Sequence, residues 1–299
     1  MIALKKQVMS FAVITAAMLI AFSGCGKKEA NEKAVVTFVL GEVTIQRKSD
    51  IRKAEVRDVL TDGDIVVTGE KSYIVVQMGD ALVFRVEAES KMEIGSITEY
   101  GKNELNLTEG LVLSKLAKLK KGEQYIIKTP TATASVRGTV FFTEYNNSVA
   151  KVAVAEGKVN IKHLSSEKET QAEADAAAVV TDSINTRKTD TVEKLILRKI
   201  QETAVIENIN SIGKEQLENE GNRIFENDIR IDKKIDKLLK KSMTLDEIKS
   251  EYGRVDVVKL YTGKIYRGAI LSRGNKVKMI TPDGTIEIES KSIKQTGSR

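Results

Sequence analysis

The sequence predicts a mainly β protein, in which a β-roll or β-sandwich is followed by a helical connector and a small C-terminal β-barrel. Short runs rich in β-branched residues recur from residue 34 to about residue 163, and Gly, Asp or Asn turns separate most of them. Apolar residues then recur at helical spacing between residues 190 and 253. Residues 255–299 return to short strands, with Asp283-Gly284 as a hairpin turn. These three observations set the order of the domains.

The composition excludes several classes of site. A chain of 299 residues predicts about two domains. Its single Cys excludes an internal disulfide framework, and one His with one Cys cannot build a Cys/His zinc site. The net charge of +6 is small, and the basic residues are interspersed with acids. Because a nucleic-acid footprint needs a clustered basic face, we expect no nucleic-acid partner. We also expect no metal and no cofactor.

Residues 1–24 have the pattern of an export signal. Two lysines precede the apolar run Val8–Phe22, which is short for a membrane span, and small residues lead to Gly24 and Cys25. The Cys at the junction resembles a bacterial lipobox, although Phe22 stands where the usual lipobox has Leu. This resemblance implies cleavage between Gly24 and Cys25 and attachment of acyl chains such as palmitate to Cys25. An ordinary signal peptide with a coincidental Cys, or an uncleaved anchor, is the alternative.

The segment after the cleavage point is expected to be a tether. Residues 25–33 contain almost no apolar side chain and cannot pack into a core. Several acyl chains on Cys25 would hold the protein stably on a membrane. The residues that follow Cys25 lack the Asp that resembles an inner-membrane retention signal. We therefore expect a lipid-anchored cell-envelope protein, on the outer membrane rather than the inner one, with the leaflet left open.

Residues 34–163 are predicted to form the β domain. Three acid-Gly turns, at Gly63, Gly110 and Gly157, are equally spaced along it. Stacked supersecondary units can produce such a period, although acid-Gly is also a common hairpin turn. The spacing favours a layered β-roll or a β-helical sandwich.

Thr129–Phe142 shows the longest alternation in the domain and predicts one long half-buried strand. One face of this strand would hold Ala132, Ala134, Val136, Gly138, Val140 and Phe142. Arg137 on the other face offers five donors and should have fixed partners. We favour a structural role for Arg137, as a clasp within the β domain, over recognition of an acidic ligand.

Several motifs of this domain together resemble the FecR domain of bacterial envelope proteins. They include Leu60-Thr-Asp-Gly-Asp64, Thr129-Pro130 and Val136-Arg-Gly-Thr-Val-Phe141. The residues that carry the resemblance most specifically are Thr129, Pro130, Val136, Arg137, Gly138, Thr139 and Phe141. The resemblance implies a FecR-like β domain over residues 34–163. Membrane-spanning FecR proteins pass a signal from a receptor to a cytoplasmic sigma factor.

Residues 164–254 are predicted to be a polar linker followed by helices. Ser165–Ala178 has the composition of a solvated linker or a frayed helix. A first helix should begin at Asp190 with Glu193 completing a capping box, and its apolar stripe continues to Gly213 as C-cap. A second helix is expected over roughly Glu215–Lys241, and a third from Thr244 to Gly253. The lysines near the end of the second helix indicate a solvated face, with anionic lipid headgroups as the alternative partner.

Residues 255–299 are predicted to contain five short strands. The run Leu260-Tyr-Thr-Gly-Lys-Ile-Tyr-Arg-Gly268 resembles an SH3-like or Sm-like small barrel. Such modules usually bind peptides, nucleic acid or sister subunits, and export makes the nucleic-acid use improbable. The sequence leaves the oligomeric state and the ligand open.

No catalytic motif is present, and we expect no enzyme. The sequence has neither a Gly-x-Ser-x-Gly elbow nor a phosphate-binding loop, and His163 is its only possible His base. Asp62-Gly63-Asp64 offers too few oxygens for calcium and is expected to be a turn. Our first interpretation is a membrane-anchored envelope lipoprotein that binds or scaffolds another envelope protein. The alternative is a module that senses envelope state, related to FecR-type sigma-factor regulators.

Overall fold

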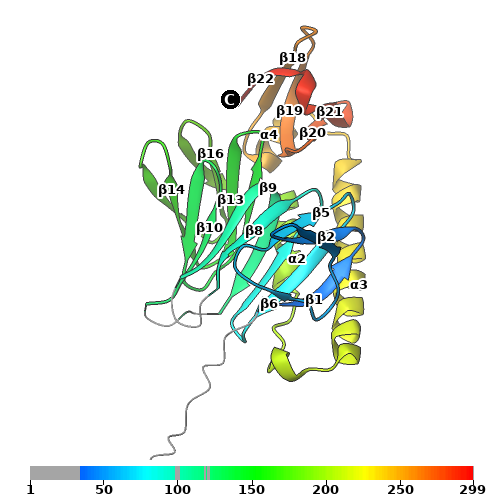
Figure 1. The fold of residues 1–299 in the computed structure, drawn as a ribbon. Helices are drawn as coiled ribbons and strands as arrows, with labels where there is room; N and C mark the ends of the chain where they lie inside the picture. Colours follow the sequence, from blue (N-terminus) through cyan, green and yellow to red (C-terminus); the bar gives the residue numbers. More distant parts are fainter. Residues whose placement is uncertain (1–33, 98–101, 118, 120–121, 299) are drawn as a thin grey trace, which may run out of the picture. The chain divides into compact units, whose positions relative to one another are not determined.

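The computed structural model describes residues 34–97, 102–117, 119 and 122–298, all within one compact unit, Glu32–Arg299 (Figure 1). The predictions made for the signal peptide, the cleavage site at Gly24, the lipidated Cys25 and the tether lie outside the described residues. Within the described part of the chain, no helix is both long enough and apolar enough to cross a membrane.

Most strands form two facing sheets, which we call sheet A and sheet B. Sheet A is antiparallel and contains, from edge to edge, β4 (Val59–Leu60), β1 (Ala34–Leu40), β6 (Tyr73–Met78), β7 (Leu82–Val86), β9 (Lys102–Leu116), β12 (Val140–Asn146), β13 (Val149–Glu156), β16 (Ala176–Val180) and β17 (Ile184–Lys188). Sheet B contains β3 (Asp50–Lys53), β2 (Val43–Arg47), β5 (Ile65–Thr68), β8 (Lys91–Ser96), β9, β10 (Gln124–Lys128), β11 (Ala132–Val136), β14 (Lys158–His163) and β15 (Glu169–Glu173). A layered β-sandwich is therefore confirmed.

Strand β9 belongs to both sheets and changes sheet at Gly110. Residues 102–109 pair with β8 and β10 in sheet B, whereas residues 110–116 pair with β7 and β12 in sheet A. Gly110 has a φ of 96°, and a Cβ there would lie 2.5 Å from the Cα of Ser90. The strand can turn from one layer into the other only because this residue has no side chain.

The predicted long strand over Thr129–Phe142 is wrong, because the chain changes sheet in its middle. β11 ends at Val136 in sheet B, and β12 begins at Val140 in sheet A. Gly138 between them has a φ of 129°, a conformation that L side chains rarely adopt. The turn and a register shift after Val140 reverse the expected facing, so that Phe141 packs between the sheets and Phe142 on the outer side of sheet A.

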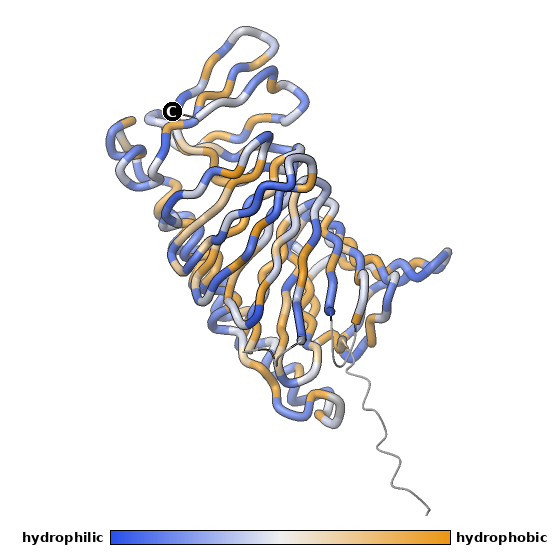
Figure 2. Tube along the Cα trace, turned by 90° about the vertical axis from the view of Figure 1, so that its left-hand side faces the viewer, coloured by the Kyte–Doolittle hydropathy of each residue, from blue (hydrophilic) through white to orange (hydrophobic). Residues whose placement is uncertain are grey.

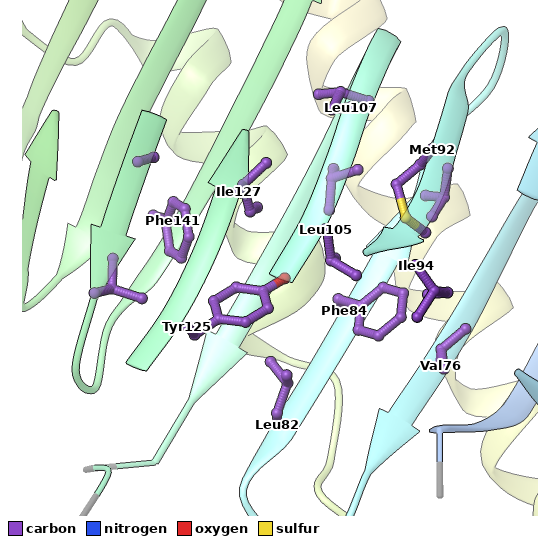
Figure 3. Packing of buried hydrophobic residues seen from close by; sticks show 14 of the residues in the cluster. Val76, Leu82, Phe84, Met92, Ile94, Leu105, Leu107, Tyr125, Ile127 and Phe141 are labelled. Atoms are coloured by element: carbon purple, nitrogen blue, oxygen red, sulfur yellow. The ribbon is translucent and has the colours of Figure 1, made fainter. Parts of the chain in front are cut away.

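The core lies between the sheets and follows the period-2 pattern of the strands. Phe84, Ile94, Leu105, Tyr125 and Phe141 come from five different strands and are almost fully buried together (Figure 3). Apolar and polar residues alternate along much of the sandwich (Figure 2), whereas β6 and β7 of sheet A are buried along their whole length. This arrangement removes apolar area from water on the inner face of each sheet, which is the main contribution to the stability of such a domain.

The sandwich extends beyond the predicted boundary at residue 163. Ser165–Ala178 is neither a solvated linker nor a frayed helix, because it contains β15 and the start of β16. Ala172, Ala177 and Ala178 are buried, and β17 adds a further strand to sheet A as far as Lys188. Small side chains at the end of the sandwich explain why the segment has the composition of a linker.

The helical region contains α2 (Thr191–Gln201), a short 3₁₀ turn (Ile209–Ser211), α3 (Lys214–Leu239) and α4 (Leu245–Tyr252). The capping boxes at Asp190 and Thr244 form as predicted. The first helix ends at Gln201 rather than near Gly213, which is instead the N-cap of α3. The expected end of α4 at Gly253 is confirmed, with a left-handed φ of 68°.

Helices α2 and α3 cover the outer face of sheet A (Figure 1). Leu197, Ile200 and Ile224 of these helices pack with Val83 and Phe142 of the sheet. The buried Gln77 donates to the carbonyl of Ile206 at 2.6 Å and accepts from its N–H at 2.8 Å, so it holds the loop after α2 on the sheet. Sheet A is therefore buried on both faces, unlike the polar outer face of sheet B.

The last five strands form a separate sheet, which we call the C-terminal sheet. Its order is β21 (Gly284–Glu289), β20 (Lys276–Thr281), β19 (Ile265–Ser272), β18 (Asp256–Leu260) and β22 (Ile293–Ser298), with a short 3₁₀ turn (Ser290–Ser292) before β22. The predicted strands are confirmed. The described strands form an open sheet that bends at Gly268, where a Cβ would lie 1.8 Å from the carbonyl oxygen of Ile280. No pairing of β21 with β22 closes a barrel among these residues.

Candidate functional site

A cavity of about 550 Å³ opens on the outer face of sheet A, beside the C-terminal sheet. β12, β13, β16 and β17 supply one wall, and the segments around β18, β19 and β22 supply the other. The charged residues of its lining are Glu144, Lys151, Arg187, Arg254, Asp256 and Arg273. A cavity of this size with mixed polar and apolar walls is the kind of site that binds small ligands or peptide segments.

Arg187 fixes one end of the cavity through the capping box of α2. Its guanidinium donates to both carboxylate oxygens of Glu193, at 2.7 and 2.5 Å. Burial opposes ionisation of Glu193, but the hydrogen bonds from Arg187 and the charge of Lys151 lower its pKa to about 2. Burial and the negative charge of Glu193 raise the pKa of the neighbouring Asp190. Although both carboxylates are buried, the pKa of Glu193 is lowered and the pKa of Asp190 is raised.

Arg254 joins the helical region to the C-terminal sheet. Its Nη1 lies 3.4 Å from Oδ2 of Asp190, and its Nε lies 3.1 Å from Oδ2 of Asp256. It also donates to the carbonyl of Ile270 at 2.5 Å. These contacts connect Arg254 to both sides of the cavity, so that this residue holds the cavity walls together.

Arg273 is the cation of the cavity that has no such partner. Lys151 pairs with Glu144 at 2.6 Å, and Glu144 also accepts from the backbone N–H of Arg273 at 3.2 Å. Among the described residues, no carboxylate lies within ion-pair distance of the Arg273 guanidinium. Burial lowers the pKa of Arg273, and the charges of Asp256 and Glu144 offset this effect only in part. The cavity therefore contains one partly buried, unneutralised guanidinium.

Replacing Glu193 by glutamine should remove a pH-dependent part of the stability. Because folding lowers the pKa of Glu193 from its ordinary 4.5 to about 2, its contribution is fully present above pH 4.5 and is lost as the pH falls towards 2. We expect Glu193→Gln to lower the free energy of unfolding by about 2 kcal/mol at pH 7. The wild-type and variant stabilities should converge as the pH falls to about 2, as measured by urea unfolding across this range.

The matched control is Glu173→Gln. Glu173 pairs with Lys158 at 2.6 Å, but both side chains are more than half exposed. Exposed pairs contribute little, and we expect a change below about 0.5 kcal/mol with no convergence. A loss for Glu193→Gln that stays constant from pH 7 to pH 2 would show that the carboxylate charge is not what stabilises this corner.

The motif residues that carry the FecR resemblance form a corner between the two sheets. Thr129 is buried, and its hydroxyl accepts from the N–H of Ala132 at 3.0 Å across the turn that contains the exposed Pro130. The Thr139 hydroxyl donates to the carbonyl of Lys158 at 3.1 Å. A Cβ on Gly157 would lie 2.5 Å from the carbonyl oxygen of Gly138.

Val136 and Phe141 of the motif are buried between the sheets, whereas the Arg137 side chain is exposed. The backbone carbonyl of Arg137 accepts from the N–H of Leu119 at 3.2 Å. The Thr129 and Thr139 hydroxyls and several backbone groups make hydrogen bonds in this corner. The proposed clasp role of the Arg137 side chain stays a prediction.

His163 is the last residue of β14 in sheet B, and both of its ring nitrogens make hydrogen bonds. Nδ1 accepts from the N–H groups of Ser165 and Ser166, at 3.1 and 3.2 Å, so Nε2 carries the proton and donates to the carbonyl of Thr181 at 2.7 Å. A general base needs a free lone pair near substrate. In this arrangement, His163 joins the end of β14 to the loop before β17.

Asp62-Gly63-Asp64 is the turn that was predicted. Asp64 accepts from Arg47 at 2.7 and 2.6 Å and from the N–H of Thr61 at 2.8 Å. Burial opposes ionisation of Asp64, yet the Arg47 hydrogen bond holds its pKa below the ordinary value. Asp62 accepts from the N–H of Ile97 at 2.8 Å. Both carboxylates stabilise the turn before β5.

Sequence reasoning missed a fully buried charge, Arg85 of β7. Its Nη1 lies 2.7 Å from Oδ2 of Asp228 on α3, and its Nε lies 2.6 Å from Oε1 of Glu87. The guanidinium lies over the ring of Tyr73, 3.6 Å from its centroid. Burial opposes the charge of Arg85, but Glu87 and Asp228 raise its pKa. One signal was available: an arginine inside the otherwise apolar strand Leu82–Val86.

Comparison with known proteins identifies part of the sandwich. Residues 64–160, about a third of the chain, match the family described as FecR protein. The matched segment runs from the turn before β5 into β14 and includes both Glu144 and Lys151 of the cavity. The chain therefore carries a FecR-like segment. No match was found among curated proteins.

Two solved structures of a candidate anti-sigma factor from Parabacteroides distasonis, at 1.65 and 2.50 Å resolution, are similar to this chain. In both cases the identity is 17% and the TM-score is 0.40. The similarity covers 46% of this chain and 65% or 64% of theirs, so the chain spans less than two thirds of their length.

Proposed function

We propose that this chain is a regulatory module of the bacterial cell envelope that senses a ligand with its FecR-like sandwich. The observation that carries the proposal is the FecR match over residues 64–160. FecR proteins are regulatory rather than enzymatic, so the match favours the signal-sensing interpretation over a binding or scaffolding lipoprotein. The cavity supports this choice, because it places the matched strands β12 and β13 against the C-terminal sheet.

In this proposal, occupancy of the cavity changes how firmly the C-terminal sheet is held. Arg254 connects Asp190 at the start of α2 to Asp256 on β18, and Lys151 approaches the carbonyl of Leu271 on β19 at 3.4 Å. A ligand between these walls contacts both parts at once. A partner that reads the C-terminal sheet would then detect the bound state through its differential affinity for the two states.

Membrane attachment through Cys25 is the second part of the proposal. The lipobox-like junction is the observation that supports it. Labelling cells with a radioactive fatty acid should mark the wild-type chain and leave Cys25→Ala unmarked. Incorporation of label into Cys25→Ala would overturn the anchor, and density-gradient fractionation of labelled membranes would assign the inner or the outer membrane.

The regulatory role predicts a defined transcriptional effect. Deleting the chain in its source bacterium should change a discrete set of envelope genes, and the full-length chain should restore the pattern in RNA sequencing. Cross-linking in intact cells should recover a membrane regulator as the dominant partner. An unchanged transcriptome together with a structural envelope protein as the dominant partner would instead support the scaffolding interpretation.

A further inference from the structure

The cavity has a charge pattern that calls for one anionic group. Three of its cations have carboxylate partners, since Lys151, Arg187 and Arg254 are all within 3.4 Å of an acid. Arg273 alone lacks one among the described residues. A planar guanidinium binds carboxylates and phosphates through paired hydrogen bonds. The missing partner is therefore a group with at least two oxygens.

Two acids limit the charge that this group can carry. Glu144 and Asp256 are close enough to act electrostatically on Arg273, and both already face the same space. A second negative charge on the ligand would be repelled by these carboxylates without meeting a second free cation. A singly charged carboxylate fits this balance better than a doubly charged phosphate.

The rest of the cavity has the chemistry of a peptide-binding groove. β17 is the last strand of sheet A and β22 is the last strand of the C-terminal sheet, and both line the cavity. Along one edge, a terminal strand leaves backbone N–H and C=O groups that can pair with an added strand. Val179 and Ile270 supply apolar contacts between these two edges. An extended peptide can pair its backbone with a strand edge and place its side chains against the apolar residues.

We infer that the cavity binds an extended peptide segment that places one carboxylate against Arg273 and pairs its backbone with the edge of β17 or β22. The carboxylate is a chain terminus or an acidic side chain. This inference rests on the proposed regulatory function, for which it specifies the class of ligand. Binding itself is a property of the purified chain and can be tested without a partner or a cell.

The test measures retention of three randomised hexapeptide pools by the full-length chain purified in detergent. The first pool has free C-terminal carboxylates and no acidic residues, the second has C-terminal amides and acidic residues, and the third has amides and no acidic residues. We expect retention of the first or the second pool and not of the third. The pool that binds identifies the source of the carboxylate.

Arg273→Gln should weaken binding of the retained pool by about tenfold or more, because it removes a charge-assisted pair of hydrogen bonds. The matched control is Arg267→Gln on β19, the strand that ends just before Arg273; the Arg267 side chain is exposed and does not line the cavity. Asn185→Trp, at an exposed position of β17, should block the cavity while Arg273 stays in place. Circular dichroism of each variant checks folding.

Four results would overturn the inference. They are equal retention of all three pools, unchanged binding by Arg273→Gln, better competition by inorganic phosphate than by the retained peptides at equal concentration, and no retention of any pool up to about 1 mM. Any of them would leave the transcriptional test of the regulatory role standing. Conversely, peptide binding with an unchanged transcriptome would retain the ligand class and remove the regulatory role.

Discussion

Replacing Arg85 by methionine should lower the free energy of unfolding by about 3 kcal/mol or more. The methionine is close in length, but it leaves Glu87 and Asp228 buried without the cation that both of them approach within 2.7 Å. Burial opposes ionisation of Glu87, and the charge of Arg85, with a smaller contribution from Lys199, holds its pKa below the ordinary value. Urea unfolding measures the loss, and limited proteolysis should show α3 cleaved first, because Asp228 ties that helix to sheet A.

Arg230→Met on α3 is the matched control. Arg230 donates to Glu202 at 2.8 Å, but its side chain is 59% exposed, and such pairs contribute at most about 1 kcal/mol. Replacing Arg85, Glu87 and Asp228 together by Met, Leu and Leu should recover much of the loss, since no unpaired buried charge remains. Equal losses for Arg85→Met and Arg230→Met would contradict the interpretation of the buried cluster.

Gly110→Ala should destabilise the sandwich by about 3 kcal/mol or more, through backbone strain and a steric clash together. The new Cβ would lie 2.5 Å from the Cα of Ser90. Ser90 cannot withdraw easily, because its N–H donates to the hydroxyl of Thr68 at 2.9 Å and its own hydroxyl accepts from the N–H of Leu111 at 2.9 Å. Thermal unfolding of the variant measures the effect.

Gly63→Ala separates the clash from the strain. Gly63 has a φ of 84°, close to the 96° of Gly110, but its Cβ would meet nothing within 4 Å. We expect a loss of only about 1–2 kcal/mol. Gly157→Ala should resemble Gly110→Ala, because its Cβ would lie 2.5 Å from the carbonyl oxygen of Gly138. Three equal losses would instead indicate that the equally spaced glycines are equivalent positions of a repeat.

The local structure was largely predictable from the sequence. Alternation located most strands, and the capping boxes at Asp190 and Thr244 located two helix starts, because both signals depend on neighbouring residues alone. The same alternation gave one strand over Thr129–Phe142, where the structure has two strands in different sheets. A change of layer at Gly138 is set by packing against Gly157, which no local pattern reports.

The candidate site was not predictable, since its residues are far apart in the chain. Arg273 joins the cavity with Lys151 and Arg187 only through the contact of the C-terminal sheet with sheet A. In the sequence, each of these three residues is indistinguishable from a basic residue exposed to solvent. The partners of Arg85 are equally remote, with Asp228 lying on a helix whose other polar residues face solvent.

The cover that α2 and α3 give to sheet A has a consequence for the order in which the chain can fold. The strands with Val83, Leu113 and Phe142 precede Leu197 and Ile224, the side chains that cover them. A chain that emerges from its N-terminus therefore carries an uncovered apolar layer until residue 239 has appeared. An apolar layer that stays uncovered for that interval favours association of the incomplete sandwich with other chains.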